Sequence, residues 1–314
     1  MIVVNWNSGP LLAQCIGCLQ GQSRAPDAVL VVDNASTDDS LAQLPTWDRL
    51  TVLRMDCNLG FAAGNNHALA RCQTEWVALL NPDAFAAPQW LEQLLLGAAL
   101  HPDAAALGSR QLCHENPHLL DGTGDSYHLS GLAWREHHGQ AQTPAHLHER
   151  EIFAPCAAAA LYRLAAVRQV GGFDESYFCY FEDVDLGFRL RLAGHTAWYL
   201  PQAVVQHVGS ATTGGQRSGF ATYHGHRNMA WTFVKNMPTP LLWALLPLHL
   251  GAHAAALAVL ALRGQAAIGL RARWHALRGL PRAWRQRRAI QHQRKASLGS
   301  LWRALDKRLW PRPH

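Results

Sequence analysis

The chain has 314 residues, of which 49% are hydrophobic and 16% charged, values that exclude a disordered chain and allow a sizeable buried core. A net positive charge is found only at one end. From Arg263 onward 14 Lys and Arg residues accompany one acid, Asp306, whereas the residues before Arg263 carry 14 bases and 21 acids. The basic character therefore belongs to the C-terminal tail, and we expect one large α/β domain followed by that tail.

Seven cysteines, an odd number, are scattered along the chain, which favours a reducing compartment over a disulfide framework. Cys15 and Cys18 form a CxxC pair, but no second pair completes a zinc site, so a packed helix face is the simpler interpretation. Met1 leads directly into a strand-like run without a basic region before it. We therefore expect no signal peptide and a cytoplasmic location.

Short β-rich runs alternate with helical runs along the first hundred residues. Such alternation is typical of βαβ units with right-handed crossovers and a mostly parallel sheet. The expected strand and helix pairs are 2–4 with 11–19, 28–32 with 40–44, 51–53 with 61–71, and 76–80 with 90–100.

Polar side chains follow each of these four strand-like runs. Asn5 follows the first run, Asp33 the second, Asn58 the third, and Asn81 with Asp83 the fourth. Because ligands on such sheets bind at the carboxyl ends of the strands, we expect these side chains to converge on one crevice. Asp33 could accept from a ribose hydroxyl or a base N–H, and Asp83 could hold Mg²⁺ or Mn²⁺ beside substrate phosphates. A turn would explain either carboxylate as well.

Residues 114–150 break this alternation and contain seven of the 18 histidines. His137 and His138 could bind a metal, but no acidic or Cys partner stands at a fixed spacing, so we interpret the segment as a solvated, variable loop. Regular structure is expected again at 153–161, with a helix at 165–169.

An acidic helix start follows a group of aromatic residues. Glu182 and Asp183 open a helical pattern in which Asp185 can pair with Arg189, and Gly194 ends the pattern. These acids could simply cap the helix and complement its dipole. Alternatively, one of them is a general base that the aromatic residues shield from water.

Residues 236–262 carry no formal charge and are long enough to span a membrane. Pro247 and two histidines, His249 and His253, weaken the drive for insertion. The arginines and tryptophans that follow favour an interfacial helix on an anionic membrane over a span or hairpin, or over a soluble helix packed on the core. We expect no nucleic-acid partner, because the tail shows no recognisable nucleic-acid-binding pattern.

Six motifs, in this order, resemble those of family 2 glycosyltransferases with the GT-A fold, and most closely the rhamnosyltransferase-like branch. The resemblance covers about residues 1–230. The motifs are Val4-Asn-Trp-Asn, Asp33-Asn-Ala-Ser-Thr-Asp, Asn58-Leu-Gly-Phe-Ala-Ala-Gly-Asn-Asn, Leu80-Asn-Pro-Asp-Ala, Gly171-Gly-Phe-Asp-Glu and Phe181-Glu-Asp-Val-Asp-Leu.

The resemblance implies an α/β GT-A domain over 1–230, with a mostly parallel sheet flanked by helices, and a helical membrane-associating tail over 231–314. It also implies inverting transfer of a sugar, with rhamnose as the candidate, from a nucleoside-diphosphate sugar to a hydroxyl of a growing surface glycan. The acceptor would be linked to polyprenyl diphosphate at the inner face of the plasma membrane. The 114–150 loop would then lie near the acceptor side.

The resemblance further implies roles for individual residues. Asp183 would be the general base, with Glu182 as the alternate, and Asp83 would be the metal carboxylate of a DxD-like motif. Asn81 occupies the first position of that motif, which leaves fewer acids for the metal. His207 resembles a metal or diphosphate ligand, although outside this context it would be a core or turn histidine.

The donor would meet several further residues. Asp33 would bind the nucleoside, and Asn5 and Asn58 lie in the matching motifs. Gly60 suits a backbone that approaches the nucleotide, although a tight turn explains it as well. Arg227 could make a bidentate contact with a phosphate of the donor or of a lipid diphosphate.

Two other classes of protein are alternatives. A nucleotidyltransferase would require a basic residue in a Gly-rich loop after the first strand, and Asn5-Trp-Asn-Ser-Gly lacks one. A non-catalytic sugar-nucleotide-binding or scaffold protein would not need both Asp83 and Asp183. A glycosyltransferase is therefore the favoured interpretation.

Overall fold

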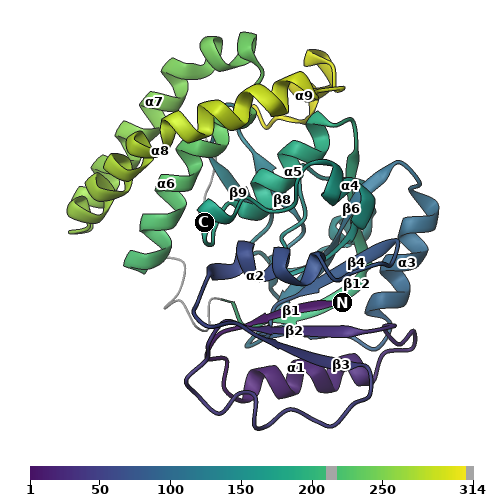
Figure 1. Cartoon of the computed structure of the whole chain (residues 1–314). Coiled ribbons are helices and arrows are strands. Elements are labelled where there is room, and N and C mark those ends of the chain that lie inside the picture. Colours follow the sequence, from purple (N-terminus) through teal and green to yellow (C-terminus); the bar gives the residue numbers. More distant parts are fainter. Residues whose placement is uncertain (210–217, 309–314) are drawn as a thin grey trace.

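The computed structural model describes residues 1–209 and 218–308 (Figure 1). Its strands are β1 (Ile2–Asn5), β2 (Val29–Asp33), β3 (Leu50–Arg54), β4 (Trp76–Leu80), β5 (Ala84–Ala86), β6 (Ala104–Cys113), β7 (Leu120–Gly122), β8 (Asp125–Tyr127), β9 (Ala133–Arg135), β10 (Arg150–Glu151), β11 (Ala159–Arg163) and β12 (Thr196–His207). Its α-helices are α1 (Pro10–Gln20), α2 (Gly60–Leu69), α3 (Trp90–Leu100), α4 (Leu164–Gln169), α5 (Glu182–Leu192), α6 (Gly219–Asn236), α7 (Thr239–Leu262), α8 (Ala266–His292) and α9 (Leu298–Ala304). Two short 3₁₀ helices are η1 (Pro144–Leu147) and η2 (Glu175–Tyr177).

A ten-stranded sheet in the order β10-β12-β6-β11-β4-β1-β2-β3 forms the centre, with β5 beside β12 and β7 beside β6. Strands β4, β1, β2 and β3 are parallel, and β12 is parallel to β6. Strand β11 joins the two groups by pairing antiparallel with both β4 and β6. The expected α/β fold is confirmed, with an antiparallel strand at the middle of the sheet.

Helices cover both faces of this sheet. Alternation along β1 sends Val3 to one face and Ile2 with Val4 to the other. Helices α1 and α3 pack on the first face, and α2, α4 and α5 pack on the second. Figure 1 shows α1 and α2 on opposite sides of strands β1 to β3. This layering leaves the carboxyl ends of β1, β2 and β4 open at one edge, where polar loops follow them.

The segment 40–44 was expected to be a helix, and this expectation was wrong. Residues 40–43 form turns instead. Ser40 donates its hydroxyl to Asp38 Oδ1 at 2.7 Å and accepts from Asn5 Nδ2 at 3.0 Å. Such side-chain bonds compete with helix formation, and Pro45 disfavours helical geometry at the residue before it.

The segment 114–150 was also misjudged as a solvated loop, because it contains β7, η1 and the β8–β9 hairpin. Asp121, Thr123 and Asp125 within it are buried. Its glycine-rich turns hid three-residue strands that are too short for a clear alternating pattern. Regular structure expected at 153–161 begins only with β11, while the helix expected at 165–169 is α4.

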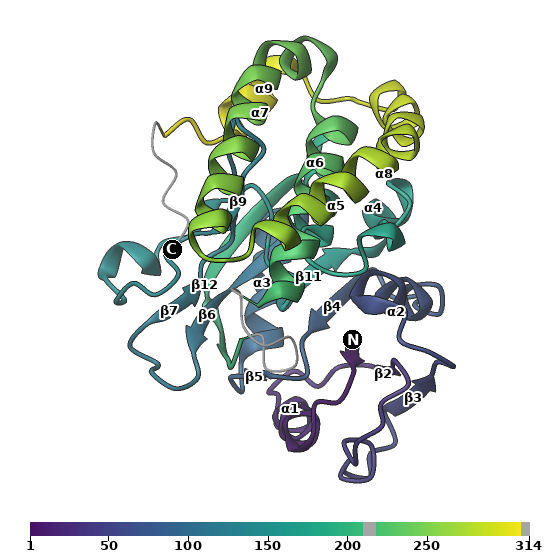
Figure 2. The same cartoon turned by 90° about the vertical axis from the view of Figure 1, so that its left-hand side faces the viewer.

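Helices α6 to α9 form a separate layer above the sheet (Figures 1 and 2). Helix α7 is the one helix among the described residues that is long and apolar enough to cross a membrane, and only 11% of its most apolar window is buried. Trp231 of α6 donates its indole N–H to the Ala276 carbonyl of α8 at 2.9 Å. Helix α6 runs through residue 230, so the expected division between 230 and 231 falls inside a helix.

Helix α6 also holds helix α5 at its acidic start. Lys235 Nζ lies 2.8 Å from Asp185 Oδ1 and 2.6 Å from Asp174 Oδ2, and Asn236 Nδ2 donates to Asp185 Oδ1 at 2.7 Å. Asp185 also pairs with Arg189 at 2.8 Å, as the sequence predicted. The Tyr177 hydroxyl also donates to Asp185 Oδ1 at 3.3 Å, so four donors satisfy one buried carboxylate and fix the orientation of α5.

Candidate active site

A cavity of about 590 Å³ opens at the carboxyl ends of β1 and β4, opposite the N-terminus of α5. Its size suits a small-molecule ligand. Strand ends, the β8–β9 hairpin and the loop before α5 all contribute side chains. Among the residues predicted for the site, seven line it: Asn58, Gly60, Asn81, Asp83, Glu182, Asp183 and His207.

Asn5 and Asp33 lie behind this lining. The two residues are register partners on β1 and β2. Asn5 Nδ2 donates to Asp33 Oδ1 at 2.9 Å and to Ser36 Oγ at 3.0 Å, and both Asn5 and Asp33 are buried. Asn34, the next residue, reaches the cavity itself. Trp6, which sequence reasoning did not single out, lines the cavity with 39% of its surface exposed.

Gly60 is required by a close backbone approach. Its φ of +84° is unfavourable for other residues, and a Cβ there would lie 2.5 Å from the Phe178 carbonyl oxygen. Asn58 Oδ1 accepts from the Gly60 N–H at 2.9 Å, and Asn34 Nδ2 donates to the Gly60 carbonyl at 3.1 Å. Asn58 therefore shapes the start of α2 at the cavity wall.

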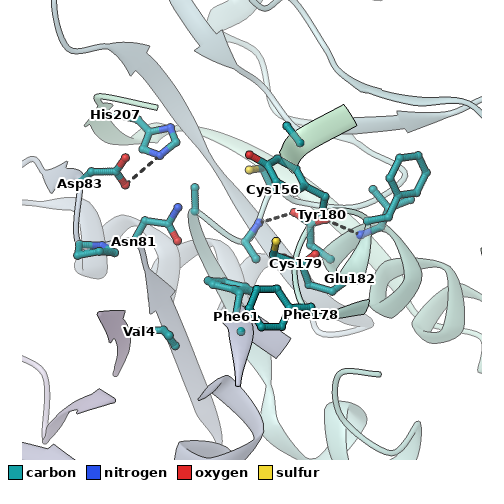
Figure 3. Close-up of a pocket in the computed structure, with 18 of the residues that line it drawn as sticks. Val4, Phe61, Asn81, Asp83, Cys156, Phe178, Cys179, Tyr180, Glu182 and His207 are labelled. Carbon is teal, nitrogen blue, oxygen red and sulfur yellow. Dashed lines mark hydrogen bonds and ion pairs between the residues drawn. The ribbon is translucent and has the colours of Figure 1, made fainter. Parts of the chain in front are cut away.

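One side of the cavity gathers Asn81, Asp83 and His207 (Figure 3). His207 Nε2 lies 3.3 Å from Asp83 Oδ1. In the described part of the chain, the buried Asn81 Oδ1 has no hydrogen-bond partner, and His207 Nε2 is directed at the Asp83 carboxylate. An amide oxygen, a carboxylate and an imidazole nitrogen brought together in this way fit a divalent cation.

Asp121 orients His207. Its Oδ2 lies 2.8 Å from His207 Nδ1, and the same carboxylate accepts from Arg135 and lies 3.4 Å from His138 Nδ1. A carboxylate behind a histidine is the usual partner of a metal ligand, because it leaves the other ring nitrogen for the metal. Burial alone would lower the pKa of His207, but the Asp121 and Asp83 carboxylates raise it to about 9.

The other side of the cavity holds Glu182 and Cys156 (Figure 3). Asp183 lies beside Cys156, with a ligand atom of each within 4.8 Å of the other. Asp183 Oδ1 accepts from the Val184 N–H at 2.8 Å, and Oδ2 accepts from the Ala157 N–H at 3.1 Å. Burial raises the pKa of Asp183 above its ordinary value even though these N–H groups lower it. A carboxylate with a raised pKa and partial exposure can take a proton from a bound hydroxyl.

Glu182 is less suited to that role. It is 6% exposed, and its Oε2 atom has no hydrogen-bond partner among residues 1–209 and 218–308. Burial, together with the adjacent Asp183 charge, raises the pKa of Glu182 well above its usual range. The neutral form of Glu182 is therefore favoured, and a neutral acid cannot act as a base.

The loop that leads into α5 is strained and held by α6. Phe178, Tyr180 and Phe181 have φ values of +67°, +64° and +69°, a region that bulky residues rarely adopt. Asn228 Nδ2 donates to the carbonyls of three loop residues, including Tyr180 at 2.7 Å. The same helix supplies a second donor, Arg227. Strain held in place by such contacts is common at functional sites.

Arg227 was expected to contact a phosphate, and the structure places it elsewhere. Its Nη2 donates to the carbonyls of Ser176 and Tyr177 at 3.2 and 2.8 Å, and its guanidinium lies over the Trp231 ring. These contacts occupy the planar face and one edge of the group. Arg227 therefore supports the strained loop from behind.

The 114–150 segment contributes charged residues to the site that the sequence did not predict, namely Asp121, Asp125 and Arg135. The signal available was the spacing of two acids around two glycines in Asp121-Gly-Thr-Gly-Asp. The histidines of this segment were considered instead of these two acids. His138 helps to hold Asp121, and His137 Nδ1 lies 2.7 Å from Thr123 Oγ1.

A helix-flanked mixed sheet with a cavity at its strand ends is the GT-A architecture of sugar-nucleotide-dependent transferases. The model of glycosyl transferase family 2 matches residues 1–171, more than half of the chain, and the chain belongs to this family. It is a glycosyltransferase, as the motifs predicted.

Known proteins agree with this assignment. An N-acetylglucosaminyl-diphospho-decaprenol L-rhamnosyltransferase of Mycobacterium tuberculosis is 29% identical over 278 residues, which cover 78% of this chain and 88% of that protein. The O-antigen chain rhamnosyltransferase RfbN of Salmonella typhimurium is 23% identical, covering 66% of this chain and 65% of its own length. These relatives confirm the resemblance to the rhamnosyltransferase-like branch.

Among solved structures, a mannosyltransferase from Pyrobaculum calidifontis in complex with GDP-Man and Mn²⁺ superposes with a TM-score of 0.56. The match covers 93% of this chain and 83% of that chain at 19% identity. It confirms the fold.

Proposed function

We propose that this glycosyltransferase moves rhamnose from a nucleoside-diphosphate rhamnose to a hydroxyl of a polyprenyl-diphosphate-linked glycan. One observation carries the proposal: the Asp83–His207 group and the Asp183 carboxylate face each other across one cavity. The sugar and the acceptor class are supported by the names of the two rhamnosyltransferases above.

The reaction follows from this opposition. In an inverting displacement, the acceptor oxygen attacks the anomeric carbon from the face opposite the diphosphate. Asp183 takes the proton of the acceptor hydroxyl as the new C–O bond forms. The bond between the anomeric carbon and the diphosphate oxygen breaks, and the diphosphate leaves with the electron pair. The base and the diphosphate site must therefore lie on opposite sides of the sugar.

The diphosphate would bind beside Asn81, Asp83 and His207. These residues would hold Mg²⁺ or Mn²⁺, which neutralises charge on the departing diphosphate when it is bound. The unpartnered Asn81 Oδ1 atom and the contact between His207 Nε2 and Asp83 support this assignment. Asp121 keeps the imidazole turned toward the diphosphate side.

The nucleoside would lie over the ends of β1 and β2. Trp6 offers an exposed ring for the base, and Asn34 offers polar atoms at the cavity wall. Asp33 and Asn5 support this floor, since their side chains bond to each other. Asn58 and Gly60 shape the adjoining wall.

We further propose that α7 and α8 dock on the anionic inner face of the plasma membrane. Trp243, Leu250 and Trp274 are each more than half exposed. Trp243 of α7 lies against Trp284 of α8, with ring centroids 6.4 Å apart, so the two helices share this surface. The 14 Lys and Arg residues from Arg263 onward add attraction to anionic lipid.

Transfer can be tested directly with the full chain. A panel of nucleoside-diphosphate sugars, including nucleoside-diphosphate rhamnose, is incubated with Mn²⁺ and an N-acetylglucosaminyl diphosphate that carries a short polyprenyl chain. Mass spectrometry should detect one added deoxyhexose only with the rhamnose donor. A thermal shift by donors without transfer to any acceptor would instead indicate a sugar-nucleotide-binding protein.

Membrane docking is tested by flotation with vesicles of phosphatidylcholine, alone or mixed with phosphatidylglycerol. Binding should require the anionic lipid and fall with salt. Leu250→Glu and Trp274→Glu should release the protein, whereas Asp48→Asn, at an exposed site in the sheet domain, should not. Protein that resists both salt and alkaline carbonate would show that α7 spans the bilayer.

A further inference from the structure

Asp125 faces the Asp183 carboxylate across the base side of the cavity. The β8–β9 hairpin positions Asp125, which is opposite Arg135 in the strand register. The Asp125 N–H donates to the Ala154 carbonyl at 2.8 Å. One ligand atom each from Asp125, Cys156 and Asp183 lies within 4.8 Å of the others. Asp125 is only 7% exposed, and it lines the cavity.

Two carboxylates this close cannot both carry full charge in a buried site. Burial raises the pKa of Asp125, and the Asp183 charge raises it further, although Arg135 opposes the shift. Asp183 has two backbone N–H donors that favour its charged form. The single proton of the pair is therefore expected on Asp125.

A metal is a poorer explanation of this cluster than a sugar. Arg135 Nη2 donates to Cys156 Sγ at 2.9 Å, and its positive charge lies where a cation would have to bind. A neutral acid beside an anionic one instead offers both a donor and an acceptor. Two neighbouring hydroxyls of a sugar ring can bind such a pair, one accepting from the neutral acid and the other donating to the carboxylate.

We propose that Asp125 is an acceptor-binding residue whose carboxylic acid holds a sugar hydroxyl adjacent to the one that Asp183 deprotonates. In the transfer step Asp125 keeps its proton, and the proton of the reacting hydroxyl goes to Asp183. The inference rests on the proposed function and deepens it, because it defines where the acceptor sugar lies. It also gives the β8–β9 hairpin a role in acceptor recognition.

The test compares Asp125→Asn and Asp125→Ala with wild type and with the Asp48→Asn control. The probes are nucleoside-diphosphate rhamnose and the short-chain N-acetylglucosaminyl diphosphate lipid. Asp125→Ala should raise the acceptor KM about tenfold, as expected for one lost hydrogen bond, and leave the donor KM unchanged. Asp125→Asn keeps a donor at the same place and should stay within about threefold of wild type.

A second readout is the pH dependence of the acceptor KM. In wild type this KM should rise as pH increases through the raised pKa of Asp125, because the ionised carboxylate no longer donates to the sugar hydroxyl, and Asp125→Asn should remove that rise. An unchanged acceptor KM in Asp125→Ala would overturn the proposal, as would a fall of kcat in Asp125→Asn equal to that in Asp183→Asn. Absence of both transfer and donor hydrolysis in wild type would reject the proposed function itself, which is a separate outcome.

Discussion

His207 Nδ1 lies 2.8 Å from Asp121 Oδ2, and this contact turns the opposite ring nitrogen toward Asp83. Strand β12 supplies the histidine and β7 supplies the carboxylate, 86 residues earlier in the chain. Because Asp121 also accepts from Arg135, which contacts Cys156 beside Asp183, one line of polar contacts joins the two sides of the cavity.

Replacing Asp121 should weaken metal binding without removing a ligand. In Asp121→Asn the orienting charge is lost, and we expect the Mn²⁺ concentration for half-maximal activity to rise about 10- to 100-fold. Titration of transfer activity with Mn²⁺ measures this change. Asp48→Asn should match wild type. An unchanged Mn²⁺ requirement would show that Asp121 does not orient a ligand.

Replacing Asp183 should stop the chemistry and spare donor binding. The amide of Asp183→Asn keeps the shape of the side chain but cannot take a proton, so kcat should fall about 10²- to 10⁴-fold. The donor-induced thermal shift should stay near that of wild type. Glu182→Gln should lose less, because Glu182 is held neutral. Near-normal turnover in Asp183→Asn would remove it as the base.

The pH dependence of kcat/KM for the acceptor should reflect the ionisation of Asp183. A base must be ionised, and burial raises the pKa of Asp183 above the ordinary value of 3.8. The sign is therefore fixed: kcat/KM for the acceptor should fall as pH decreases, and the fall should begin at a higher pH than for an ordinary aspartate. Measuring kcat/KM across acid pH checks this. A flat profile down to the ordinary range would contradict it.

Lys235 should matter for stability more than its distance from the cavity suggests. Without its charge, the buried Asp174 loses its ion pair and Asp185 keeps only the one with Arg189, so Lys235→Met should lower the free energy of unfolding by about 3–5 kcal/mol. Urea unfolding at neutral pH measures the loss. Lys295→Met, at an exposed position, is the control, and equal stability of the two variants would contradict the prediction.

The loss of stability in Lys235→Met should be smaller at acid pH. Burial alone would raise the pKa of Asp174, but Lys235 and the Ser176 hydrogen bonds hold it well below 3.8. A depressed pKa contributes stability that is present above 3.8 and lost as pH falls below it. The difference between wild type and Lys235→Met should accordingly narrow in that acid range.

Local pattern was sufficient for the fold around the first four strands. Buried apolar runs followed by polar turns predicted β1 to β4 and the polar edge after them. Asn58, Asn81 and Asp83 line the cavity there, whereas Asn5 and Asp33 lie behind its lining. Asp83 and Asp183 were predicted from motifs that lie at the end of a strand and at the start of a helix. Those signals are local in the chain.

The missed residues depend on distant contacts. Asp121 and Asp125 sit on three-residue strands whose burial comes from packing against residues far along the chain, and no periodicity marks them. Arg227 was misplaced for a similar reason. Its carbonyl partners, Ser176 and Tyr177, lie about 50 residues earlier, and only the fold brings them together.

The path of α6 decides how the chain can be recombined. Asn228 holds the strained loop, and Lys235 with Asn236 holds Asp185, so the second half of this helix supports the residues around the cavity. A chimaera that exchanges the C-terminal helices between relatives should be joined at Met237 or Pro238, where α6 has ended and α7 has not begun. A joint at 230 would replace Lys235 and Asn236, which hold Asp185 of α5, with the residues of the other relative.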